Sequence, residues 1–163
     1  MFSAEDQQMT IDHITAQRAT GGPEPRHAAI LLVEDDPSVR GLVTRLLTLK
    51  KYRVLAADSG RAALPLWERH RDEIDLLLTD VMMPHGMSGR DLAAHCQSQN
   101  PRLKVIFTSG YNMELSTADG WLRAGVNFLP KPYRPEQLLE LIREVLATAP
   151  NAKTETYVAS SSR

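Results

Sequence analysis

The sequence has one cysteine, almost no net charge and no long run of hydrophobic residues. The single cysteine, Cys96, excludes an intramolecular disulfide. With 19 basic and 20 acidic residues the net charge is -1, so no long-range positive field would attract nucleic acid or an anionic membrane. No stretch approaches the roughly 20 apolar residues of a membrane span, and the N-terminus is acidic where a secretory signal would be basic and apolar. These absences predict a cytoplasmic protein that binds neither nucleic acid nor membrane.

The length of 163 residues suits one domain with a full hydrophobic core and short extensions. Residues 1–27 are polar and contain the turn-rich sequence TGGPEP, and residues 148–163 end in VASSSR. We expect both ends to be flexible tails. The segment between them, residues 28–147, is predicted to be the folded domain.

Within this predicted domain, short aliphatic runs alternate with amphipathic segments. Such alternation is typical of strand and helix units that build a parallel sheet. Strands are expected at residues 28–33, 52–57, 74–79, 104–108 and 126–129. Helices are expected at residues 39–49, 59–69, 89–99, 112–124 and 135–147, the second of them weakened or bent by Pro65. Five such units predict a doubly wound α/β sandwich.

Polar side chains follow four of the five predicted strands at the point where each strand ends. In chain order they are Glu34, Asp35, Asp36, Asp80, Thr108, Ser109 and Lys131. Ligands of open parallel sheets bind beyond the carboxyl ends of the strands, so these groups are expected to converge. Crowded carboxylates repel one another unless one is protonated or a cation lies between them, and oxygen ligands with room for water suit Mg²⁺. Lys131 could then neutralise a phosphoryl group that the metal alone would not balance.

Four segments of the chain resemble the receiver domain of two-component response regulators, of the type also found in hybrid histidine kinases. They are ILLVEDDPSVR, LLLTDVMMPHGMSG, VIFTSGY and FLPKPY, and they occur in the order found in that family. The resemblance covers nearly the whole predicted domain. It implies a flavodoxin-like (βα)5 sandwich with a five-stranded parallel sheet in the order 2-1-3-4-5. It also implies a phosphoacceptor that catalyses its own phosphorylation and dephosphorylation rather than an enzyme.

The resemblance assigns a role to each polar residue at the predicted sheet edge. Asp80 would attack a phosphohistidine of a sensor kinase and form an acyl phosphate. Asp35, Asp80 and the backbone carbonyl of Met82 would bind Mg²⁺, and Glu34 would assist through water. Phosphoryl transfer needs little beyond such positioning and charge neutralisation.

Three further residues complete the site that the resemblance implies. Thr108 would donate a hydrogen bond to the phosphoryl group, and Lys131 would contact it. The bond between Lys131 and Pro132 is expected to be cis, as in similar domains. Phe128 occupies the aromatic position that rotates inward when Thr108 moves, so Thr108 and Phe128 would form the switch.

The resemblance also implies partners. They would be a sensor histidine kinase, a hybrid kinase or a phosphotransfer protein. After residue 147 too few residues remain for an effector domain, so we expect a receiver without a fused output domain. Its output surface, which could also form a homodimer, would comprise residues 112–124, 126–129 and 135–147, with Trp121, Tyr133 and Leu139 as apolar contacts.

Alternative functions use the same residues differently. A haloacid dehalogenase-like Mg²⁺-dependent phosphohydrolase also has an aspartate nucleophile after a strand, but it needs a D-x-D pair and TDVMMP has none. A pseudo-receiver that only binds would lack Asp80 or Lys131, and both are present. A receiver that passes the phosphoryl group on as an intermediate of a phosphorelay remains open.

Other residues have structural interpretations. Asp36 is expected to be the N-cap of a helix that has Pro37 in its first turn, rather than a metal ligand. Cys96 is expected to be a small core residue. Trp121 could pack at a domain edge or contact a partner. The loop MPHGMSG has one residue more than the commonest family pattern, which leaves the position of His85 open.

Overall fold

The structure is a computed structural model, and it describes residues 27–84, 86–110 and 122–148. Five parallel strands form one sheet in the order β2-β1-β3-β4-β5. The strands are β1 (Ala29–Val33), β2 (Arg53–Ala57), β3 (Ile74–Asp80), β4 (Lys104–Ser109) and β5 (Phe128–Pro130). This order confirms the predicted flavodoxin-like fold.

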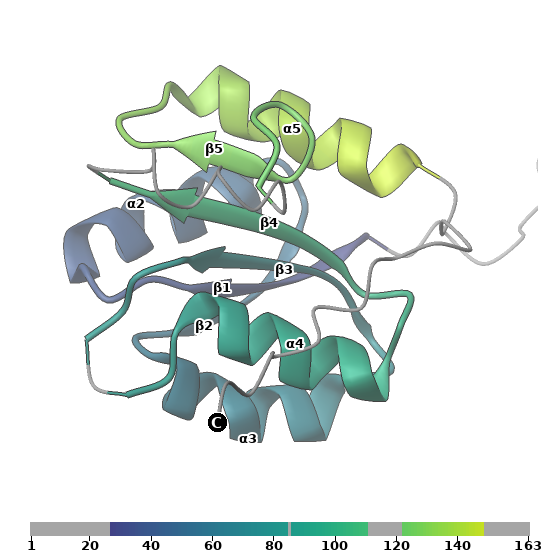
Figure 1. The fold of residues 1–163 in the computed structure, drawn as a ribbon. Coiled ribbons are helices and arrows are strands. Elements are labelled where there is room, and N and C mark those ends of the chain that lie inside the picture. Colours follow the sequence, from purple (N-terminus) through teal and green to yellow (C-terminus); the bar gives the residue numbers. More distant parts are fainter. Residues whose placement is uncertain (1–26, 85, 111–121, 149–163) are drawn as a thin grey trace, which may run out of the picture.

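Helices cover both faces of the sheet (Figure 1). They are α2 (Pro37–Leu49), α3 (Gly60–His70), α4 (Gly89–Gln99) and α5 (Pro135–Ala147). The helices α2 and α5 pack on one face, and α3 and α4 pack on the other, so the domain has three layers. Both α4 and α5 have the predicted bounds, and α3 continues through Pro65. No helix within the described part of the chain is long and apolar enough to cross a membrane.

The predicted ends of two elements near β5 are wrong. Most of the predicted helix at residues 112–124 lies outside the described residues, but residues 122–124 are not helical. Residues 126 and 127, predicted as strand, belong to a turn in which Gly125 has a φ of +72° and the Asn127 side chain accepts a hydrogen bond from the Arg123 N–H at 2.7 Å. This turn delays the start of β5 to Phe128.

Two hydrophobic cores lie on opposite faces of the sheet. The core under α3 and α4 contains Trp67, Cys96 and Phe107, all fully buried. The Trp67 indole N–H donates to the Gln99 side-chain oxygen at 2.8 Å, which joins these two helices. Cys96 is the small core residue that the sequence predicted, and burial raises the pKa of its thiol to about 12. The core under α2 and α5 is mainly aliphatic.

The predicted terminal tails, residues 1–27 and 148–163, lie outside the described residues except for His27 and Thr148. The described residues lie in the predicted domain apart from these two, and the bounds of the domain and of its tails stay predictions. In this domain the carboxyl ends of all five strands point to one edge of the sheet (Figure 1).

Candidate functional site

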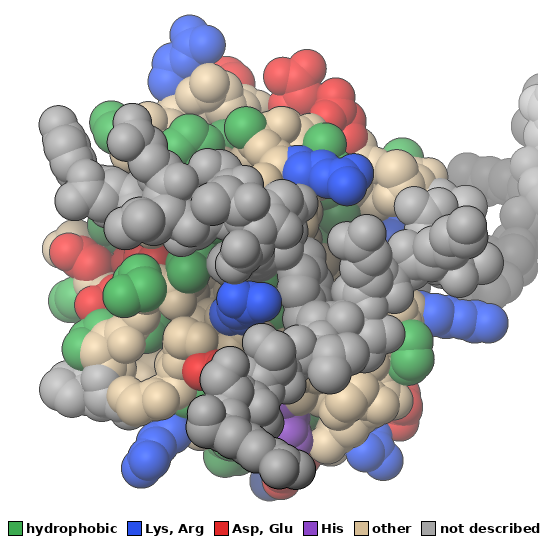
Figure 2. All heavy atoms as spheres, in the orientation of Figure 1, with side chains coloured by type: hydrophobic (Ala, Val, Ile, Leu, Met, Phe, Trp, Pro, Cys, Tyr) green, Lys and Arg blue, Asp and Glu red, His purple; other side chains and the backbone are tan. Residues whose placement is uncertain are grey.

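The carboxyl edge of the sheet brings acidic, hydroxyl and ammonium groups together. The parallel register pairs Val33 of β1 with Thr79, and Asp80 of β3 with Thr108 of β4. Lys131 directly follows β5, and its backbone N–H donates to the Ser109 carbonyl at 2.7 Å. Acidic side chains also gather on this side of the surface, at the left edge in Figure 2. The convergence that the sequence predicted is therefore present.

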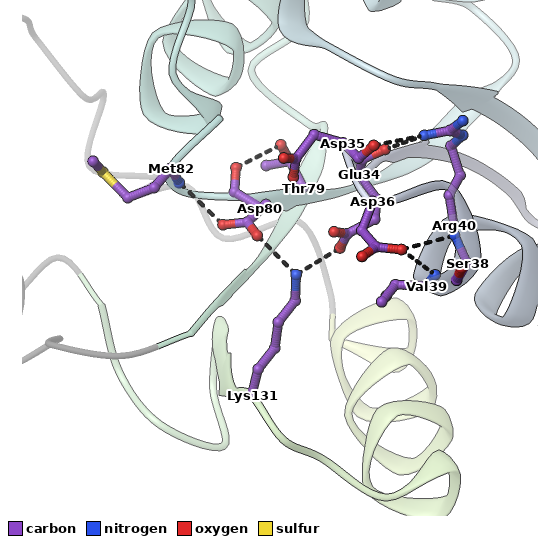
Figure 3. Close-up of polar contacts among 10 residues, drawn as sticks. All are labelled: Glu34, Asp35, Asp36, Ser38, Val39, Arg40, Thr79, Asp80, Met82 and Lys131. Carbon is purple, nitrogen blue, oxygen red and sulfur yellow. Dashed lines mark hydrogen bonds and ion pairs between the residues drawn. The ribbon is translucent and has the colours of Figure 1, made fainter. Parts of the chain in front are cut away.

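Asp80, the last residue of β3, is held at both carboxylate oxygens. Its Oδ1 accepts a hydrogen bond from the Met82 backbone N–H at 3.0 Å, and its Oδ2 accepts one from Lys131 Nζ at 2.7 Å (Figure 3). The Val81 N–H donates to the Thr108 carbonyl at 2.9 Å, which ties the residue after Asp80 to β4. The Asp80 side chain is thus oriented by the fold, and 10% of it is exposed to solvent.

Lys131 lies between Asp80 and Glu34, and its Nζ is 2.7 Å from an oxygen of each. Burial raises the pKa of Glu34 above its ordinary value, although Lys131 opposes the rise. Burial alone would lower the pKa of Lys131, but its hydrogen bonds to Asp80 and Glu34 outweigh burial and raise it. Lys131 is therefore an ammonium ion at neutral pH. It compensates part of the negative charge at the sheet edge.

Glu34, Asp35 and Asp80 form a group that could hold a metal ion. Each offers a carboxylate oxygen, and these oxygens lie within 4.8 Å of one another. Glu34 and Asp80 are buried, whereas Asp35 is exposed and gives the group an opening to water. Lys131 pairs with two of the three carboxylates, those of Glu34 and Asp80. The excess of carboxylates over this ammonium, together with the oxygen-only donors, fits Mg²⁺.

Two other residues predicted at this edge, Asp36 and Met82, lie beside the carboxylate group. Asp36 is outside the carboxylate group: its side chain accepts hydrogen bonds from the Ser38 and Val39 N–H groups, which confirms it as the N-cap of α2. These hydrogen bonds lower the pKa of Asp36. Met82 contacts Asp80 through its backbone N–H, and its side chain is exposed. A role for the Met82 carbonyl stays a prediction.

The two residues predicted to form the switch are both buried. Thr108 is 2% exposed and lies beside Asp80 in the register, whereas Phe128 is 4% exposed and its ring packs in the core under α3 and α4. The aromatic ring is thus already inside the protein in this structure. The bond between Lys131 and Pro132 is cis, as predicted.

The predicted output surface is only partly described. Tyr133 and Leu139 are half-buried against the core under α2 and α5, and burial raises the pKa of the Tyr133 phenol. Trp121 and His85 lie outside the described residues.

Two residues beside the site were missed from the sequence. Arg40, in the second turn of α2, donates from Nη1 to the Glu34 carbonyl at 2.7 Å and to the Asp35 carbonyl at 3.2 Å (Figure 3). Gly89, the first residue of α4, packs so closely on β3 that a Cβ atom there would lie 2.0 Å from the Asp80 carbonyl oxygen. The available signals were a basic residue shortly after the acidic run and a glycine at the end of the following loop. Neither signal identifies a contact by itself.

The chain is similar in sequence to known proteins over the domain described above. The chain matches the family model of the response regulator receiver domain over residues 30–143. It is 37% identical over 119 residues to the sensor kinase CckA of Brucella abortus, covering 73% of this chain and 12% of that protein. It is 37% identical over 118 residues to the transcriptional regulatory protein CpxR of Escherichia coli, covering 72% of this chain and 48% of that protein. The chain thus spans less than half the length of these relatives.

Solved structures show the same likeness. The receiver domain of the hybrid histidine kinase CckA is 34% identical, with a TM-score of 0.59, and the match covers 73% of this chain and 99% of that one. The non-phosphorylated receiver domain of HemR from Leptospira biflexa is 26% identical, with a TM-score of 0.66, and the match covers 77% of this chain and 99% of that one. Both matches extend over nearly all of the compared domain.

Proposed function

Since this chain belongs to the response regulator receiver domain family, we propose that it is a phosphorylation-controlled switch in which Asp80 accepts a phosphoryl group from a histidine kinase. The family consists of phosphoacceptor switches of two-component signalling that bind Mg²⁺ at an acidic pocket. The observation that carries the proposal is the placement of Asp80, held by Lys131 Nζ at 2.7 Å and grouped with Glu34 and Asp35. Family membership also removes the haloacid dehalogenase alternative.

In the proposed reaction, one carboxylate oxygen of Asp80 forms a bond to phosphorus while the P–N bond of the donor phosphohistidine breaks. The electron pair of that bond leaves with the imidazole, and the product on Asp80 is an acyl phosphate. Mg²⁺, held by Glu34, Asp35 and Asp80, would neutralise charge on the phosphoryl oxygens when bound. Two side chains of the protein would stabilise the remaining charge. The Lys131 ammonium can form an ion pair with a phosphoryl oxygen, and the Thr108 hydroxyl can donate a hydrogen bond to another.

The output of the switch is proposed to be a change in protein contacts. Added negative charge at Asp80 would draw Thr108 toward the phosphoryl group and alter the packing between β4 and β5. Tyr133 and Leu139, half-buried beside this region, are the described candidates for the contact surface. The partner would be a kinase, a phosphotransfer protein or a second copy of the chain.

A relay role is a second candidate. The observation favouring it is the 34% identity to the receiver domain of the hybrid kinase CckA. In a relay, Asp80 would pass the phosphoryl group on to a histidine of a phosphotransfer protein. Transfer of labelled phosphate from the phosphorylated chain to such a protein would distinguish a relay from a terminal switch.

The variant Asp80→Asn tests the proposed function. Incubation with acetyl phosphate and Mg²⁺, followed by intact-mass measurement, should show an acyl phosphate on the wild type and none on the variant, because an amide is not a nucleophile for this reaction. The matched control is Asp58→Asn, which changes an exposed carboxylate just after β2 that is outside the metal group and should leave phosphorylation unchanged. Comparable phosphate incorporation by Asp80→Asn would refute the assignment.

A further inference from the structure

We propose that Arg40 is a positioning residue that holds the loop carrying Glu34 and Asp35 in the conformation that binds Mg²⁺. The inference rests on the proposed function, because it concerns the metal of that same site. Arg40 does not touch the carboxylates of the metal group through any described hydrogen bond. It bonds the backbone carbonyls of the two residues that carry them.

The contacts of Arg40 begin where the sheet ends. The last described backbone hydrogen bond from this loop to the sheet is from the Glu34 N–H to the Ala57 carbonyl at 3.2 Å. From that point Nη1 of Arg40 donates to the Glu34 carbonyl at 2.7 Å and to the Asp35 carbonyl at 3.2 Å. A charged donor forms stronger hydrogen bonds than a neutral one. Because Nη1 of Arg40 bonds two carbonyls, it restrains the consecutive peptide groups that follow Glu34 and Asp35.

The same helix holds the end of this loop. The Asp36 carboxylate accepts hydrogen bonds from the Ser38 and Val39 N–H groups at 2.7 and 3.0 Å. The Arg40 N–H donates to the Asp36 carbonyl at 2.9 Å. The helix α2 is itself anchored by the buried side chains of Val43 and Leu47. The acidic loop is therefore tied to a packed helix by the Arg40 side chain and by the Asp36 cap.

The charge of Arg40 and its position have opposite effects on cation binding. A positive charge near the carboxylates repels Mg²⁺, so if charge were its only effect, removing Arg40 would strengthen Mg²⁺ binding. Loss of positioning has the reverse effect, because a loop without its anchor must be ordered when the ion binds. Groups that orient metal ligands typically contribute 10–100-fold to metal affinity. We therefore expect the positioning effect to win.

The test is a calorimetric Mg²⁺ titration of the full chain and of variants shown to be folded by circular dichroism. Arg40→Met keeps an unbranched side chain but removes the donors, and it should weaken Mg²⁺ binding about tenfold. Arg40→Lys should restore much of the affinity, because an ammonium can also bond two carbonyls, as Lys104 does with Leu146 and Thr148. Arg45→Met, an exposed arginine of the same helix, is the control and should not weaken binding.

Amide exchange on the metal-free proteins gives a second readout. Exchange at Asp35 and Asp36 should become faster in Arg40→Met and stay near the wild-type rate in Arg45→Met. Equal or tighter Mg²⁺ binding by folded Arg40→Met would overturn the positioning role while the proposed function stands. If Arg40→Met does not fold, the same comparison is made with Arg40→Gln. Failure of the wild-type chain to bind Mg²⁺ would instead refute the metal site of the proposed function.

Discussion

Replacing Gly89 by alanine should displace the phosphoacceptor although the substitution lies nine positions away from it in sequence. A Cβ atom at Gly89 would lie 2.0 Å from the Asp80 carbonyl oxygen and 2.9 Å from Thr79 Oγ1. Ordinary contacts of this kind start at 3.4 Å, so the Gly89 and Asp80 backbones would have to separate by roughly 1.4 Å. The nearest atom belongs to the backbone, so a side-chain rotation cannot relieve the contact.

The cost of this displacement can be compared with the gain in helix propensity. Overpacking a close contact costs about 1–3 kcal/mol. Alanine in a helix interior is more stable than glycine by up to ~1 kcal/mol. Position 89 is the first residue of α4, so the substitution there should gain only part of this free energy. We therefore expect Gly89→Ala to lower the free energy of unfolding by about 2 kcal/mol. Phosphorylation should slow by about tenfold or more, because catalysis is sensitive to displacements near 1 Å.

Urea unfolding and the rate of phosphorylation by acetyl phosphate would measure both effects. Gly41→Ala is the matched control, because Gly41 is inside α2 and a Cβ atom there meets nothing within 4 Å. That control should raise the free energy of unfolding by about 0.5–1 kcal/mol and leave phosphorylation unchanged. The reasoning is refuted if Gly89→Ala unfolds at the wild-type urea concentration and is phosphorylated at the wild-type rate.

Three further predictions concern other parts of the domain. Asp35→Ala should weaken Mg²⁺ binding and phosphorylation together without destabilising the metal-free protein, since it relieves repulsion between carboxylates; unchanged affinity in calorimetry would place the metal elsewhere. Phe128→Leu keeps an apolar residue in the core and should cost less than ~1.5 kcal/mol, yet it should abolish the changes in amide exchange that phosphorylation causes between residues 108 and 146; persistence of those changes would exclude Phe128 from the switch. Cys96 is fully buried and has a pKa of about 12, so iodoacetamide at neutral pH should label it only after unfolding; rapid labelling of the native protein would contradict this.

Local signals in the sequence account for most element bounds. The helix α4 begins where Ser88 caps it through the Asp91 N–H, and α5 begins at Pro135, so both starts were predicted correctly. The helix α2 begins at Pro37, two residues before the start that the hydrophobic period gives, and this start agrees with the predicted Asp36 cap and Pro37 in the first turn. The start of β5 was predicted two residues too early. The turn before it depends on the positive φ of Gly125, which the hydrophobic pattern of residues 126–129 does not indicate.

The sequence by itself determined the composition of the candidate site. Parallel strands present their carboxyl ends at one edge, so polar residues directly after the strands had to lie near one another. That reasoning requires only the end of each strand, which the hydrophobic runs mark. It was sufficient to place Glu34, Asp35, Asp80, Thr108 and Lys131 at one edge, together with Asp36 and Ser109.

Only the tertiary structure decided which of these groups touch and what holds them in place. Lys131 pairs with Glu34 and Asp80, which are 97 and 51 positions away in sequence. Arg40 bonds the loop carbonyls, and Gly89 lies against the backbone of Asp80. Such contacts depend on strand register and on how closely the helices approach the sheet. Those quantities are set by packing of the whole core, and local hydrophobic patterns do not contain them.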